Sequence, residues 1–226
     1  MNWEDECFLL SKRKFRENAN IINVLTLKKG KVAGIVYGGN SRKIRNYLQI
    51  SNKLFVFNNS KNDTKIGYFK TELIKPVSPK YFNDKKRTSA LISICSLLNS
   101  LLPDSQPYEY IYKSFEKFID SLSFDNWIIL YVFFEINLIK ELGFDTNLNI
   151  YTDTTSDINS IKKINIDKYD YEVPFFLIKQ KIPDEVSNKL IKKSLIFTRT
   201  VLYNKFFIPN NIIFPKSRVI LENYFS

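Results

Sequence analysis

The pattern of apolar and polar residues changes character about one third of the way along the chain. Before residue 76, β-branched and aromatic residues form short runs separated by glycine or polar turns, a pattern typical of β-strands. Five short strands within about 75 residues favour a small closed barrel, and the OB-fold is the leading candidate. We expect these strands at Cys7–Leu10, Ala19–Leu27, Val32–Tyr37, Lys53–Phe57 and Lys65–Ile74.

The remainder of the chain shows helical periodicity. Pro76 and Pro79 mark the change, because two closely spaced prolines fit neither a helix interior nor a central strand. The predicted fold is therefore α+β, with an N-terminal OB-fold β-barrel at 1–75 and an α-helical domain at 76–226 that includes a loop-rich insertion with minor strands near 145–183. The expected helices are Thr88–Leu102 with an earlier start capped by Asp84, one opened by Pro107, Asn126–Leu142 between the cap Asp125 and Gly143, one from the cap Asp184 to Tyr203, and Lys216–Tyr224.

The amino-acid composition excludes several kinds of catalytic and metal-binding site. The 226 residues include no histidine and two cysteines, Cys7 and Cys95, which excludes His-dependent nucleophiles and a four-cysteine zinc site. We expect both cysteines to be reduced and buried, with no metal and no cofactor. The acidic residues at 4–6 do not fit a signal peptide, and the longest apolar stretch is too short to span a membrane. We therefore expect a cytoplasmic protein.

The charge is unevenly distributed. The chain carries a formal net charge of +11, and residues 1–75 hold 15 basic and 6 acidic residues, a net +9. Such asymmetry indicates a polyanionic partner for the first part, nucleic acid before membrane. Ten basic residues fall in three clusters, which we expect to track phosphates if the barrel brings them together. They are Lys12, Arg13, Lys14 and Arg16; Lys28, Lys29 and Lys31; and Arg42, Lys43 and Arg45.

Aromatic residues accompany these clusters. Phe15, Tyr37 and Tyr47 suit either the core or base stacking, whereas Phe55 alternates like a core residue. The pair Gly38-Gly39 fits a turn or a close approach to phosphate, but no nucleotide-binding loop follows it, so we expect no ATPase activity.

Paired carboxylates are the remaining sign of an enzyme. Glu4, Asp5 and Glu6 form one acidic group, and Asp153 with Asp157 forms a second that could in principle hold magnesium. Neither has a recognisable third ligand at a strand end, so solvated charge or capping is the better interpretation.

Several motifs follow one another over about the first 150 residues. They are Trp3-Glu4-Asp5-Glu6 with Leu9-Leu10-Ser11, Glu17, Val24-Leu25-Thr26, Gly30, the run from Val32 to Gly39, Ser41–Arg45, Leu48-Gln49, and Trp127 through Phe134-Glu135, Leu138 and Glu141 to Phe144. In this order they resemble the bacterial RecO family of recombination mediators. Ile50 replaces the proline usual after Leu48-Gln49, and the stretch around Ile150 lacks the cysteines of the zinc module that many members carry.

The resemblance implies a non-enzymatic, nucleoid-associated protein of bacterial recombinational DNA repair. Such a protein would bind ssDNA and dsDNA, anneal complementary strands, and act with RecR and the C-terminal tail of SSB to assist loading of RecA. The cations available for the acidic SSB tail on the helical domain are Lys113, Lys117 and Lys140. The alternative is an OB-fold RNA-binding protein that acts on tRNA or ribosomes, because backbone contacts do not separate DNA from RNA.

Overall fold

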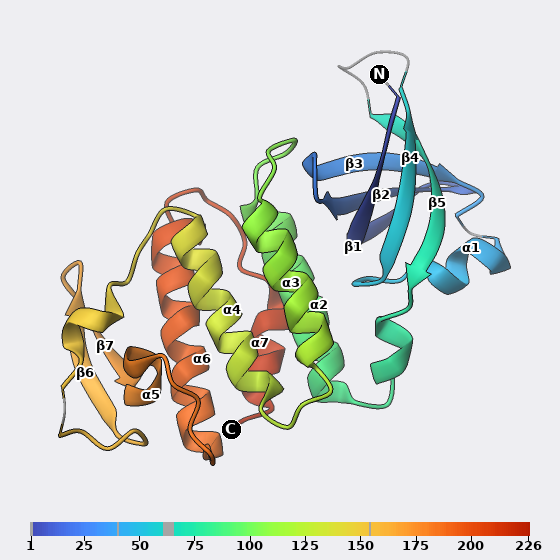
Figure 1. The fold of residues 1–226 in the computed structure, drawn as a ribbon. Coiled ribbons are helices and arrows are strands. Elements are labelled where there is room, and N and C mark those ends of the chain that lie inside the picture. Colours follow the sequence, from blue (N-terminus) through green and yellow to red (C-terminus); the bar gives the residue numbers. More distant parts are fainter. Residues whose placement is uncertain (1, 40, 61–65, 154) are drawn as a thin grey trace. The chain divides into compact units, whose positions relative to one another are not determined.

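The computed structural model describes residues 2–39, 41–60, 66–153 and 155–226. The chain divides into two compact units (Figure 1). The first comprises residues 1–113 and 215–218, and the second comprises residues 114–214 and 219–226. Each unit is described by itself below.

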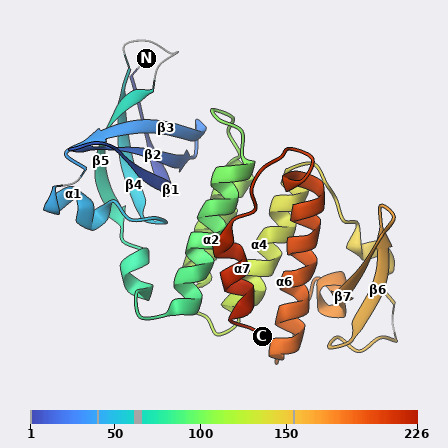
Figure 2. The ribbon, with the colours of Figure 1, turned by 180° about the vertical axis from the view of Figure 1, so that it is seen from behind.

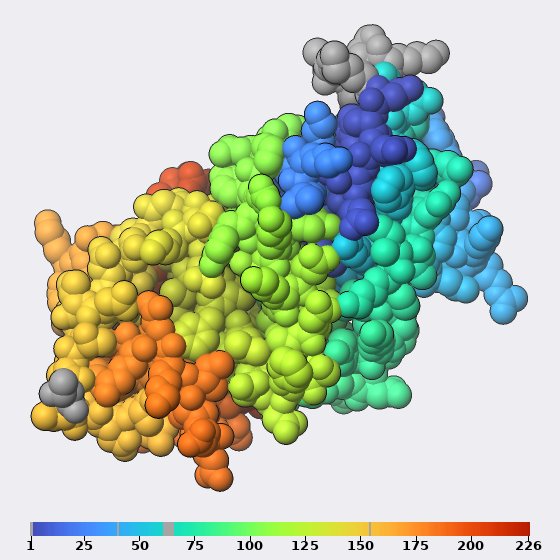
Figure 3. Space-filling view, viewed as in Figure 1, coloured from blue at the N-terminus to red at the C-terminus, as the bar shows by residue number. Residues whose placement is uncertain are grey.

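Five strands of the first unit form a closed barrel in the order β1-β2-β3-β5-β4 (Figure 1). The long strand β1 pairs through its first half with β4 and from Cys7 onwards with β2, so that one strand belongs to two sides of the barrel. Figure 3 shows β1, β4 and β5 side by side on the barrel surface. The α+β prediction of an N-terminal OB-fold barrel followed by helices is confirmed. The strands are β1 Trp3–Arg16, β2 Ala19–Thr26, β3 Gly30–Tyr37, β4 Lys53–Asn59 and β5 Gly67–Lys75.

Alternation along the strands fills the barrel. Side chains of one face point inward, where they bury an apolar cluster that includes Cys7, Ile22, Val56 and Phe69. The short helix α1, Arg42–Tyr47, covers this cluster with Ile44 and Tyr47. It lies where the sequence predicts only a break after β3. The predicted start of the fifth strand at Lys65 lies outside the described residues, as does Asn40 in the predicted break.

The helix α2, Lys85–Leu101, belongs to the same unit as the barrel and packs against β1. Asp84 caps it, accepting a hydrogen bond from the Arg87 amide at 3.0 Å, so the earlier start expected from the sequence is confirmed. Near its other end, the Asn99 side chain accepts hydrogen bonds from Asn23 on β2 (2.7 Å) and Ser11 on β1 (3.5 Å). Polar contacts therefore fix the helix to the barrel wall.

Helices α4 (Trp127–Glu141) and α6 (Asn188–Leu202) lie side by side in the second unit, as Figures 1 and 2 both show. Between them the fully buried Glu135 carboxylate accepts hydrogen bonds from the hydroxyls of Tyr131 (2.8 Å) and Thr198 (2.5 Å). A buried carboxyl group needs such partners, and the bond from Thr198 joins α6 to α4, whereas the bond from Tyr131 lies within α4.

Two predicted helix starts are wrong. Helix α4 begins after Asn126 rather than Asp125, and the Asn126 side chain makes no capping hydrogen bond; the Ile129 amide donates to the Asn126 carbonyl at 2.9 Å. Helix α6 is capped by Ser187, which accepts from the Leu190 amide, and not by Asp184. Gly143, with φ of 95°, follows the cap of α4 as predicted.

The region predicted as loop-rich contains more regular structure than the expected minor strands. A two-stranded sheet and a short helix occupy much of it, beside α6 (Figure 2). The described part of the chain has no helix long and apolar enough to cross a membrane. The domain division after residue 75 stays a prediction. The remaining elements are η1 Ser78–Tyr81, α3 Glu109–Ser121, η2 Leu148–Tyr151, β6 Ile161–Ile166, β7 Tyr169–Pro174, α5 Phe175–Lys179, η3 Tyr203–Phe207 and α7 Lys216–Asn223.

Candidate nucleic-acid interface

Two of the three basic clusters meet on the barrel. The cluster from Lys12 to Arg16 lies on the second half of β1, where the sequence suggests a strand end or loop. The Lys12 ammonium donates a hydrogen bond to the Leu48 carbonyl (2.8 Å), at the end of α1. We call the combined set of cations the β1–α1 basic surface. It consists of Lys12, Arg13, Lys14, Arg16, Arg42, Lys43 and Arg45.

Local forces hold α1 beside β1 even though its cations repel. The Ser41 hydroxyl caps the helix by accepting from the Ile44 amide at 3.4 Å. Partial burial, and then the charge of Arg45, lower the pKa of Lys12. Most of the other cations of the surface are exposed. An anion placed here would relieve the repulsion, which is the electrostatic property expected of a phosphate-binding surface.

The remaining cluster lies elsewhere, so the three do not form one groove. In the β2–β3 hairpin, Thr26 pairs with Gly30 at the turn and Ala19 pairs with Tyr37 at the open end. Seven residue steps separate these two ends, about 23 Å at a strand rise of 3.3 Å. Lys28 and Lys29 lie at the turn, whereas β1 ends beside Ala19.

Lys31 is engaged within the first unit. Its ammonium donates to the Asn99 carbonyl (2.8 Å) and lies 3.1 Å from the Asp104 carboxylate. Its side chain is only 12% exposed. These contacts join the start of β3 to the end of α2 and to the loop after it, so Lys31 already has partners within the unit.

The predicted stacking residues differ in their surroundings. Tyr47 packs against the barrel core, and its hydroxyl donates to the Thr71 carbonyl (2.8 Å). This ring therefore holds α1 in place. Phe15 is 42% exposed, and the Arg16 guanidinium lies 5.2 Å from its ring centroid. The prediction of Phe55 as a core residue is wrong: Leu54 and Val56 fill the barrel, and Phe55 lies on the opposite face of β4, half-buried against Phe57 with ring centroids 4.9 Å apart.

Tyr37 has a partner that was not among the predicted residues. Its ring stacks on that of Tyr68, with centroids 5.3 Å apart and planes inclined by 27°. A hydrogen bond with the Tyr68 hydroxyl raises the pKa of Tyr37. The alternation of Tyr68 with the buried Phe69 along β5 marks Tyr68 as outward-facing, and this was the available signal.

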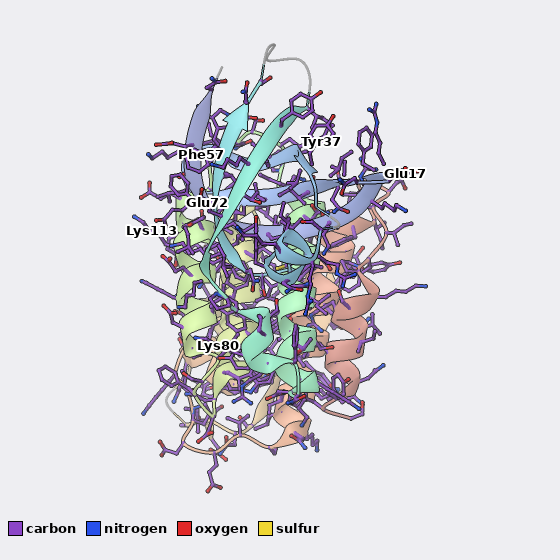
Figure 4. The ribbon with its side chains drawn as sticks, turned by 90° about the vertical axis from the view of Figure 1, so that its right-hand side faces the viewer. Glu17, Tyr37, Phe57, Glu72, Lys80 and Lys113 are labelled. Atoms are coloured by element: carbon purple, nitrogen blue, oxygen red, sulfur yellow. The ribbon has the colours of Figure 1, made fainter. Side chains whose placement is uncertain are left out.

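These two rings lie at a groove of about 1160 Å³ beside β5. Figure 4 looks onto this part of the barrel, with Tyr37 and Phe57 on either side of β5. The lining is mainly apolar and aromatic, and its charges balance. The charged residues that line the groove are Lys43 and Lys70, Glu4 and Glu72.

The acidic groups serve structural contacts. Asp5 is buried and accepts from the backbone amides of Glu6 (2.9 Å) and Lys28 (2.8 Å). Asp153 accepts from the Lys162 ammonium (2.9 Å), which, with further hydrogen bonds from Ser156, holds its pKa well below the usual range. Among the described residues, no group of three or more metal-ligating side chains is close enough to hold an ion.

The aspartate side chains at 153 and 157 accept hydrogen bonds from backbone amides that follow them in turns. The Asp157 carboxylate accepts from the Asn159 amide at 3.2 Å.

In the region expected to bind the SSB tail, Lys113 pairs with Glu109 along α3, and Lys140 lies 3.1 Å from Asp145. Lys117 is exposed on α3. Carboxylates of the chain itself therefore already engage two of the three predicted cations.

A closed five-stranded barrel with a helix between β3 and β4, followed by helices, defines an OB-fold protein with a helical C-terminal region. Residues 1–77 match the family model "Recombination protein O N terminal", and residues 83–170 match "Recombination protein O C terminal". The chain belongs to the RecO family.

Several curated relatives are named "DNA repair protein RecO". One from Wolbachia sp. subsp. Drosophila simulans is 30% identical over 66% of this chain and 62% of its own length. One from Cereibacter sphaeroides is 32% identical over 66% of this chain and 62% of its own length. One from a Ruegeria species is 30% identical over 71% of this chain and 68% of its own length. The matched region thus spans less than two thirds of the first two relatives.

Proposed function

We propose that this chain is a non-enzymatic DNA-binding protein of recombinational DNA repair, and that the β1–α1 basic surface binds the phosphates of ssDNA and dsDNA. The observation that carries the proposal is the hydrogen bond from Lys12 to the end of α1, which brings two basic clusters together. Family membership supports the DNA-repair role. Lys28 and Lys29, at the other end of the hairpin, would add a separate phosphate contact.

The salt dependence of DNA affinity tests this proposal. Each phosphate contact to single-stranded DNA contributes about 0.7 to the slope of log affinity against log salt. The triple variant Arg42→Ala, Lys43→Ala, Arg45→Ala should therefore flatten the slope by about 2 if all three residues contact phosphate. Fluorescence anisotropy with a labelled oligonucleotide would measure it.

A matched variant controls for net charge. Lys80, Lys85 and Lys86 belong to the same unit and are exposed, but they lie outside the β1–α1 basic surface. Figure 4 labels Lys80. Their replacement by alanine removes the same charge and should leave the slope nearly unchanged. An equal effect of both triple variants would mean that the surface has no special role.

Strand annealing is the proposed activity. A positive surface lowers the repulsion between two phosphate backbones while the base edges stay free to pair. The RecO resemblance adds RecR, the SSB tail and, indirectly, RecA as partners in a bacterial cytoplasm, with Lys113, Lys117 and Lys140 as candidate contacts to the SSB tail. Annealing of SSB-coated strands, with and without the triple variant of α1, tests this part. Annealing by that variant at the normal rate would contradict it.

An RNA-binding role on tRNA or ribosomes is the second possibility, and the RecO matches do not favour it. Competition separates the two. Unlabelled tRNA that displaces labelled ssDNA at far lower concentration than unlabelled ssDNA does would favour RNA as the ligand. The non-enzymatic assignment predicts no magnesium-dependent cleavage of either nucleic acid.

A further inference from the structure

The stacked pair Tyr37 and Tyr68 has no evident packing role in the barrel. The rings are 53% and 48% exposed, and neither belongs to the buried cluster that fills the barrel. They come from the end of β3 and the start of β5, two strands that pair only at Gly34–Gly67 and Ile35–Tyr68 among the described residues. Two adjacent rings that leave half of their surface open offer a flat apolar face for a ligand.

The surroundings indicate which ligand fits. Both rings line the groove, and its two lysines are balanced by two glutamates, so the groove itself lacks a strong positive field. Arg16, part of the β1–α1 basic surface, lies close enough to Tyr37 to influence its ionisation. An aromatic groove beside a cationic surface suits a molecule with flat faces and a charged backbone.

Single-stranded nucleic acid combines those features, because an unpaired base exposes its π-face while its phosphates stay on one edge. In a duplex the base faces are stacked on their neighbours, and only base edges and phosphates are accessible. A ring platform therefore discriminates between the two forms, whereas a basic surface does not.

We propose that Tyr37 and Tyr68 form a stacking platform for unpaired bases, and that stacking on it makes the barrel bind single strands more tightly than duplex. This inference rests on the proposed DNA-binding function. It adds Tyr68 to the interface. The β1–α1 basic surface would bind the phosphates of single strands and duplexes alike, whereas the ring pair would bind only bases that are unpaired.

The double variant Tyr37→Leu, Tyr68→Leu tests the platform. Loss of one stacked base should weaken binding of a single-stranded oligonucleotide by about 5- to 150-fold, while affinity for a duplex of the same sequence stays within about twofold. The salt slope should not change, because no cation is lost. The fluorescence of a 2-aminopurine base in the oligonucleotide reports stacking. It should change when the oligonucleotide binds the wild type and should not change when it binds the double variant.

Two further variants keep the test decisive. Tyr37→Phe, Tyr68→Phe retains the rings and should keep the single-strand preference. Tyr110→Leu removes a 54% exposed ring from α3 in the same unit and should bind like the wild type. Thermal unfolding would show that each variant is folded.

The outcomes distinguish this inference from the proposed function. Normal single-strand preference in the leucine variant, together with weakened binding by the α1 triple variant, would overturn the platform and leave the phosphate surface standing. Equal losses for single strand and duplex would also overturn it. If neither set of variants affects binding, both proposals fail.

Discussion

Replacement of the buried Asn52 by alanine should destabilise the barrel strongly. The Asn52 side chain is fully buried, and its carbonyl oxygen accepts from the backbone amides of Val77 (2.8 Å) and Ser78 (3.1 Å). Its amide nitrogen donates to the Tyr47 carbonyl at 2.9 Å. One side chain thus joins the end of α1 to the segment that leaves β5.

The magnitude follows from these three contacts. Alanine leaves the buried Val77 amide without its partner, at a cost of about 1–3 kcal/mol, and removes two partly buried hydrogen bonds of about 0.5–1.5 kcal/mol each. The sum is about 2–6 kcal/mol, a large part of the stability of an ordinary domain. With a urea m-value of about 2 kcal/mol/M, the midpoint should fall by about 1–3 M.

The assay is urea unfolding followed by the fluorescence of Trp3, which packs against the barrel core, in a Trp127→Phe background. Asn59→Ala is the matched control, because Asn59 is an exposed asparagine at the far end of β4, the strand that follows Asn52, and its replacement should shift stability by about 0.5 kcal/mol or less. A midpoint for Asn52→Ala within about 0.3 M of the parent would refute the reasoning, as would an equal loss in the control.

Three further predictions concern single positions. Gly30→Ala should lower the free energy of unfolding by several kcal/mol, because φ is 68° and the added Cβ would lie 1.8 Å from the Gln106 carbonyl oxygen; urea unfolding of that variant measures it. Cys7 and Cys95 should resist alkylation in the folded protein, since burial raises the pKa of both thiols; rapid labelling without denaturant would contradict this. Because the pKa of Asp153 is depressed in the folded state, its ionised form stabilises the protein above the ordinary carboxyl pKa, and this stabilisation is lost as the pH falls below about 4. The free energy of unfolding of Asp153→Asn, measured against pH, should therefore fall less steeply in acid than that of the parent.

The elements with strong local signals were predictable. Alternation and turn residues located the strands, and the polar side chain of Asp84 located the start of α2. Helix α1 was missed because it is only six residues long and its stability comes from packing Ile44 and Tyr47 on the core. Asp184 failed as a cap because Ser187 lies nearer the first residues that α6 buries.

The candidate interface was predictable in composition and less so in geometry. Lys12 and Arg45 belong to clusters visible in the sequence, but only the hydrogen bond from Lys12 to the end of α1 shows that they meet, and only the strand register shows that Lys28 does not join them. Tyr68 was not predicted as an interface residue because it does not lie near any of the three basic clusters in the sequence. Its relation to Tyr37 depends on a parallel pairing between distant strands, which local pattern does not encode.

That pairing is the narrowest join in the barrel wall. Gly34 and Gly67 face each other there, and a side chain on either would collide with Phe69 or Asn58. Tyr37 and Tyr68 extend from the two strands of this join and stack on each other, so a base stacked on the outer face of the pair would extend a ring stack that already links β3 and β5. Ligand binding at the ring pair would then stabilise the β3–β5 pairing, so occupancy of the groove would raise the free energy needed to open the barrel at this join.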